Sequence, residues 1–204
     1  MEYPDLNGVT ANFGFKLTGA WTEADFTILS QASGDFCRAF HWEVPVQQPW
    51  LHGLEVRLEQ IAYGGLTSRG LVRLNPAGLT VWTVVHELGH ALDWSQFSRL
   101  SFRLMCATRS YGPWPLLHTL YPLQKQYWYH VGSPSPPCGS DQNFNRLEDF
   151  AETVAAYVYP DEAHRRAAQR GYPYEEQGYT HFAQTPRGKF IAALAAAAKK
   201  APTT

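Results

Sequence analysis

Residues 79–97 read LTVWTVVHELGHALDWSQF, and this stretch decides the fold. Its apolar residues recur every three or four positions, which is the period of an α-helix with one buried face. The cluster of Asn, Pro and Gly at 75–78 is typical of a turn. The sequence therefore predicts a helix over residues 79–97, and this helix carries the motif His86-Glu87-Leu88-Gly89-His90.

The motif places two imidazoles and one carboxylate on a single helix. His86 and His90 are four residues apart, so both leave one face of the helix and can bind one metal ion. Glu87 faces the open side of such an ion, where it can take a proton from an attacking water and pass it to a leaving amine. Asp93 either supports this site or pairs with Arg99 on the surface. Imidazole ligands joined by a carboxylate and a water are the usual hydrolytic site of zinc, so we expect one zinc ion per chain.

A third protein ligand is expected on a second helix, predicted over residues 146–159 (RLEDFAETVAAYVY). This helix offers Glu148, Asp149 and Glu152. Glu148 and Glu152 share a face, whereas Asp149 is rotated by about 100° from Glu148. One glutamate can bind the metal while the other accepts the free N–H of a ligand histidine, and the spacing leaves open which glutamate has which role.

Other segments have weaker patterns. Alternating apolar residues predict strands within 53–64 and 68–76, and helical spacing predicts a helix over 22–40. The stretch 132–145 is rich in Gly, Pro, Ser and Asn, which predicts a loop that lines the active-site cleft. Further helices are expected at 116–128, at 161–170 and after Pro186.

Length and composition narrow the class of protein. The chain has 204 residues and a net charge of −1, which suits a single domain over 1–204. It has no dense run of Lys or Arg for a nucleic-acid partner, and no apolar stretch approaches the ~20 residues of a membrane span.

No signal peptide is visible, so a cytoplasmic protein is expected by default, or a secreted one if a leader has been removed. Cys37, Cys106 and Cys138 are odd in number and widely spaced, which favours thiols over a disulfide framework.

HELGHALD followed by LEDFAETVAAYV resembles the gluzincin metallopeptidases. Within them it is similar to the anthrax lethal factor-like group, which includes the Mlc titration factor peptidase and the bacterial Pro-Pro endopeptidases. The resemblance covers about residues 70–160, and a segment at 185–191 is weakly similar to the family's end. It implies His86, His90 and Glu148 as zinc ligands, Glu87 as the general base, and Glu152 as the partner of a ligand histidine.

One position departs from the family pattern. The lethal factor-like group has a tyrosine seven residues before the glutamate ligand, where it stabilises the oxyanion, and this chain has Asp141 there. An ionised carboxylate cannot donate a hydrogen bond, so another donor is expected. Tyr129 is the first candidate and His130 the second. The remaining candidates are Tyr127, Tyr111 and His181.

The resemblance implies an α+β, zincin-like domain. It would contain a small twisted sheet, an active-site helix under the edge of this sheet, and a mostly helical C-terminal half. The strand at 68–76 resembles the zincin edge strand, which pairs with an extended substrate. The expected function is zinc-dependent endopeptidase activity on a peptide or protein substrate. The alternatives are a non-catalytic zincin-like sensor or binding domain, and an effector or toxin protease with a single protein target.

Overall fold

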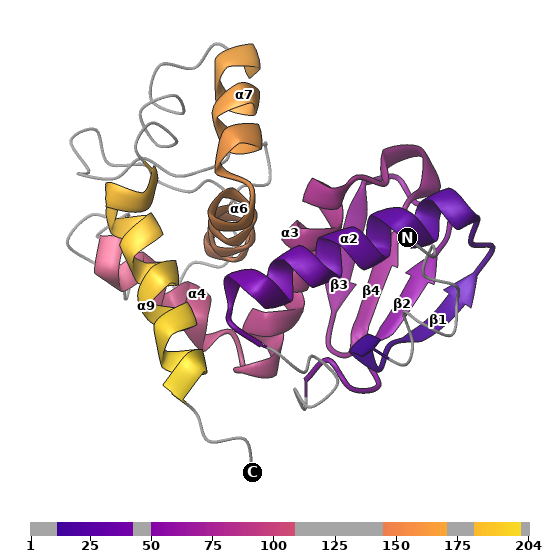
Figure 1. Cartoon of the computed structure of the whole chain (residues 1–204), viewed down its shortest axis with the longest axis horizontal. Coiled ribbons are helices and arrows are strands. Elements are labelled where there is room, and N and C mark those ends of the chain that lie inside the picture. Colours follow the sequence, from indigo (N-terminus) through magenta and orange to yellow (C-terminus); the bar gives the residue numbers. More distant parts are fainter. Residues whose placement is uncertain (1–11, 43–49, 109–144, 171–181, 201–204) are drawn as a thin grey trace. The chain divides into compact units, whose positions relative to one another are not determined.

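The computed structural model describes residues 12–42, 50–108, 145–170 and 182–200, and its fold is α+β (Figure 1). The strands are β1 (Lys16–Gly19), β2 (Glu55–Leu58), β3 (Gly65–Ser68) and β4 (Leu71–Leu74). The helices are α2 (Glu23–Ala39), α3 (Val81–Ser95), α4 (Arg99–Thr108), α6 (Arg146–Val158), α7 (Pro160–Arg170) and α9 (Pro186–Lys200), with short 3₁₀ turns η2 (Pro76–Gly78) and η3 (Phe182–Gln184). Two compact units result, Met1–Ser95 with Ala195–Thr204, and Gln96–Leu194.

The first unit contains a mixed four-stranded sheet in the order β1-β2-β4-β3. Strands β1, β2 and β4 are parallel, and β3 is antiparallel to β4. The edge beside β4 is therefore β3, which begins at Gly65. The prediction that 68–76 forms the edge strand is wrong, because β4 lies inside the sheet and pairs on both sides. The hairpin between β3 and β4 turns at Gly70, whose φ of 77° is readily adopted by glycine.

The two faces of the sheet differ in polarity. Val56, Leu58, Val72 and Leu74 are buried on one face. The other face carries ion pairs between Arg57 and Glu55 and between Arg73 and Glu59. Side chains alternate between the two faces along a strand, and residues paired across neighbouring strands lie on the same face. The register therefore shows which β3 residues lie on the buried face. Gly65 is opposite Leu74 and Thr67 is opposite Val72, so both β3 residues belong to the buried face.

Helix α3 covers this buried face at its β3 edge, where it contacts β3 and β4. Helix α2 packs against α3 and runs across the strands (Figure 1). A capping box at Thr22 begins α2: the Thr22 hydroxyl accepts from the Asp25 N–H, and the Asp25 carboxylate accepts from the Thr22 N–H. Helix α3 follows η2, where the Asn75 side chain accepts from the Ala77 N–H. The predicted helices at 22–40 and 79–97 and the turn at 75–78 are thereby confirmed.

The second unit is helical throughout its described part. Helix α6 packs against α4, α7 and η3, and buries Phe150, Ala151, Val154 and Ala155. The Arg146 guanidinium, at the start of α6, donates to the Ser98 carbonyl 3.1 Å away, just before α4. The helices predicted at 146–159, at 161–170 and after Pro186 are confirmed. Helix α4 was not predicted, and the segments 116–128 and 132–144 lie outside the described residues.

Two further observations concern the whole described chain. No helix in the described ranges is both long enough and apolar enough to cross a membrane. Cys37 and Cys106 are free thiols, as predicted, whereas Cys138 lies outside the described residues. Burial raises the pKa of the Cys37 thiol to about 12, so this cysteine is a packing residue of α2.

Candidate metal centre

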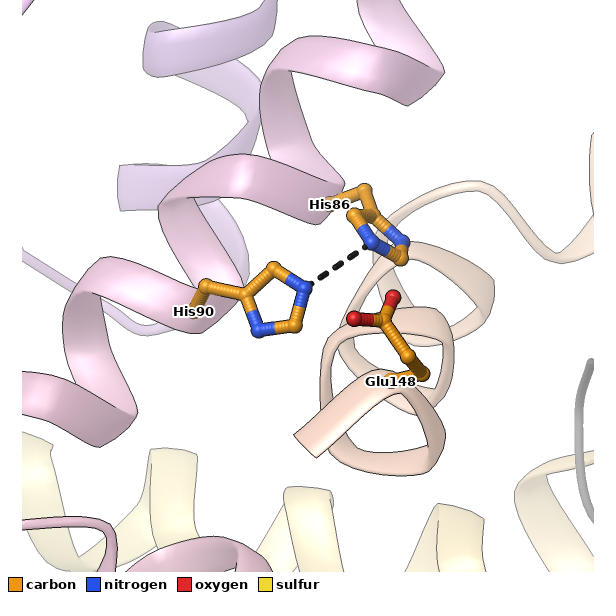
Figure 2. A group of neighbouring side chains, drawn as sticks. All are labelled: His86, His90 and Glu148. Carbon is orange, nitrogen blue, oxygen red and sulfur yellow. Dashed lines mark hydrogen bonds between the residues drawn. The ribbon is translucent and has the colours of Figure 1, made fainter. Parts of the chain in front are cut away.

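Helix α3 brings its two histidines together. The Nε2 atoms of His86 and His90 are 3.1 Å apart, and the imidazole planes make an angle of 79° (Figure 2). Ligand nitrogens at the usual 2.0–2.1 Å from a tetrahedral zinc ion are about 3.3 Å apart. The two Nε2 atoms thus already have nearly the separation that a shared zinc ion requires. His90 is 9% exposed, and His86 is half-buried.

A carboxylate completes a possible ligand set. The described residues contain one group of three side chains that could hold a metal ion, namely His86, His90 and Glu148. Figure 2 labels these three side chains, with His86 and His90 on one helix and Glu148 on another. Two imidazole nitrogens and one carboxylate oxygen are the donors of many hydrolytic zinc sites, so these residues fit zinc. Glu152 is not in this group, and its predicted role beside a ligand histidine stays a prediction.

Glu148 lies in the first turn of α6, where the helix cap fixes its backbone. The side-chain oxygen of Asn145 accepts from the Leu147 N–H at 2.8 Å and from the Glu148 N–H at 3.4 Å. This cap satisfies donors that the first turn of a helix otherwise leaves unpaired.

Glu87 is buried between α3 and the edge strand, with 4% of its surface exposed. Its Oε2 accepts a hydrogen bond of 2.6 Å from the Thr67 hydroxyl. Its carboxylate also lies against Gly65: a Cβ atom placed on this glycine would be 2.4 Å from Oε1. The structure therefore holds the Glu87 carboxylate against β3, one residue after His86 along the helix.

Two further acidic residues of these helices, Asp93 on α3 and Asp149 on α6, are buried. Asp93 is 2% exposed, so its carboxylate is buried, and its two predicted roles, support of the site or a pair with Arg99, stay predictions. Asp149 forms a bidentate ion pair with Arg187 on α9, with both nitrogen–oxygen distances 2.8 Å and both side chains 1% exposed. This pair assigns Asp149 to the packing of the second unit.

Several residues of the site could not be placed by sequence reasoning. Thr67 and Gly65 carry no motif, and only the register of β3 shows that they face Glu87. Arg187 lies in the segment 185–191, which gave no signal of a buried cation. The oxyanion-donor candidates and the departing position all lie outside the described residues: Tyr111, Tyr127, Tyr129, His130, Asp141 and His181.

Comparison with known proteins adds no relative. No family model matches the chain, and no curated protein or solved structure matches it. The functional argument therefore depends on the residues and the geometry described above.

Proposed function

We propose that this protein is a zinc-dependent endopeptidase with a zincin-like fold. The observation that carries the proposal is the convergence of His86 and His90 on one point, with Glu87 buried beside them on the same helix. Packing of a helix against a sheet does not require two imidazole nitrogens 3.1 Å apart. The position of α3 under the β3 edge supports a zincin-like arrangement, in which the active-site helix lies under the edge of a small sheet.

The proposal gives each residue a role. His86, His90 and Glu148 would hold one zinc ion, and the edge strand β3 would pair with an extended peptide. Zinc, when bound, polarises the scissile carbonyl and makes the attacking water more acidic. Glu87 accepts the proton of that water and passes it to the amine that leaves. Tyr129 remains the first candidate for the donor to the oxyanion, followed by His130.

Metal analysis and peptide digestion test the proposal together. The purified protein should contain about one zinc ion per chain, and a peptide library digested with it should show cleavage by mass spectrometry that 1,10-phenanthroline abolishes. Glu87→Gln should keep the zinc but lose several orders of magnitude in turnover, because only the proton transfer is removed. His90→Ala and Glu148→Ala should instead weaken zinc binding itself.

The outcomes separate the proposal from its alternatives. Failure to take up zinc would refute the metal centre. Bound zinc without cleavage of any library peptide would favour a non-catalytic zincin-like binding domain. Loss of zinc in Glu87→Gln, with zinc retained in Glu148→Ala, would show that the roles of these two glutamates are assigned wrongly.

A further inference from the structure

The edge strand β3 presents two small residues to the face that α3 covers. Gly65 and Thr67 are two positions apart, so they point to the same side of the sheet. Their cross-strand partners, Leu74 and Val72, are both buried. The Thr67 hydroxyl therefore lies in a partly buried position next to α3. Among the described residues, both of its hydrogen-bond acceptors belong to Glu87.

The bond between Thr67 and Glu87 has the geometry of a charge-assisted hydrogen bond. Its oxygen–oxygen distance is 2.6 Å, within the range of 2.5–2.7 Å that is typical for a hydroxyl donating to a carboxylate. The same hydroxyl oxygen is 3.2 Å from the backbone carbonyl oxygen of Glu87, a longer and weaker contact. The hydroxyl proton therefore goes to Oε2, and the torsions of the Glu87 side chain are fixed by this bond.

Gly65 restricts the same carboxylate from the other side. A Cβ atom on Gly65 would be 2.4 Å from Oε1, 2.5 Å from Cγ and 2.6 Å from Cδ of Glu87. These distances are far below van der Waals contact, so any larger residue would displace the carboxylate. The absence of a side chain at Gly65 and the hydroxyl at Thr67 together define one position for Glu87.

We infer that Thr67 is a positioning residue for Glu87 and that Gly65 supplies the space that this position requires. The inference rests on the proposed function, in which Glu87 is the general base. Thr67 occupies Oε2, which leaves Oε1 as the oxygen that accepts the proton of the attacking water. A base held in one geometry avoids the loss that misplacement by about 1 Å causes, on the order of 10²-fold in rate.

Removing only the hydroxyl tests this role in the zinc-loaded protein. Thr67→Val should lower kcat about 10- to 100-fold, with KM and zinc content unchanged, because the base acts in the transition state and does not bind substrate. Thr67→Ser restores the donor and should recover most of the turnover. In the Glu87→Gln background, Thr67→Val should cause no further loss, since the two residues act as a unit.

The opposite edge of the sheet provides a matched control. On β1, the Thr18 hydroxyl donates to the Glu55 carboxylate at 3.1 Å, which is the same kind of pair at a site without histidines. Thr18→Val should therefore leave kcat unchanged. A kcat for Thr67→Val equal to that of Thr18→Val would overturn the positioning role.

A second measurement does not need activity. In metal-free protein, Thr67→Val should lower the melting temperature more in the wild-type background than in Glu87→Ala, because the carboxylate partner is absent in the latter. Thr18→Val should lower it equally in both backgrounds. An equal shift for Thr67→Val in both would refute the contact itself. If the wild type cleaves no peptide but this coupling is observed, the proposed function fails while the contact between Thr67 and Glu87 stands.

Discussion

Asp149 and Arg187 form a buried ion pair in the described part of the second unit. Both nitrogen–oxygen distances of the pair are 2.8 Å, and both side chains are 1% exposed. Removing two charges from water is costly, and the good bidentate geometry offsets this cost. The pair is stable only as a pair, because either charge alone would be buried without its counter-ion.

We therefore expect Arg187→Met to destabilise the protein by about 3–5 kcal/mol, measured by urea unfolding. The double variant Asp149→Leu with Arg187→Met should lose less than the single variant, since no lone charge remains. Arg165→Met is the control: Arg165 pairs with Glu162, but its side chain is 57% exposed, so water screens this pair and its loss should change the stability little. Equal midpoints for Arg187→Met and Arg165→Met would contradict this account.

The candidate metal-binding motif could be predicted at the level of single residues, but its surroundings could not. His86 and His90 lie one helical turn apart in any helix, so their convergence follows from local geometry. Thr67 reaches Glu87 only through the register of β3 on β4, which is a tertiary property. For the same reason, the partner that Arg187 finds in Asp149, 38 residues away in sequence, carries no local signal.

At the scale of elements, the start of α6 links helix stability to the candidate metal centre. The Asn145 side chain caps the helix through the N–H groups of Leu147 and Glu148. If the cap is lost, the first turn frays, and Glu148 belongs to that turn.

Asn145→Ala should cost about 1 kcal/mol of stability and should also weaken zinc affinity. Asn145→Asp keeps a capping oxygen, so it should retain both. Thr22→Ala removes the equivalent cap of α2, which carries no candidate ligand, and should lower stability alone. Titration with a competing chelator measures the affinity, and unchanged zinc affinity in Asn145→Ala would separate the cap from the metal centre.

The elements also show where sequence patterns fail. The helices α2, α3 and α6 span enough residues for their apolar period to be clear, and all three agree with prediction to within a few residues. Strands β1 (KLTG) and β3 (GLTS) contain one large apolar residue each, too few for alternation to stand out, and neither was predicted. Missing β3 made β4 look like the edge strand, although β4 has partners on both sides.

At the scale of the whole molecule, the candidate ligands come from two helices that are far apart in the sequence. His86 and His90 come from α3, and Glu148 comes from α6. An unfolded chain does not hold such residues together, so an ion that binds all three binds the folded protein almost exclusively. Zinc binding is then part of the folding free energy.

Zinc should consequently raise the melting temperature of the full chain. A ligand at 1,000 times its dissociation constant adds about 4 kcal/mol to the free energy of unfolding. For a chain of this length, each kcal/mol shifts the melting temperature by about 2–4 °C, so the expected rise is on the order of 10 °C. Scanning calorimetry with excess zinc and with EDTA measures the shift. Because Glu87 is assigned no metal contact, Glu87→Gln should keep the full shift, whereas His90→Ala should abolish it. A wild-type melting temperature that is the same in zinc and in EDTA would contradict the coupling between metal binding and folding.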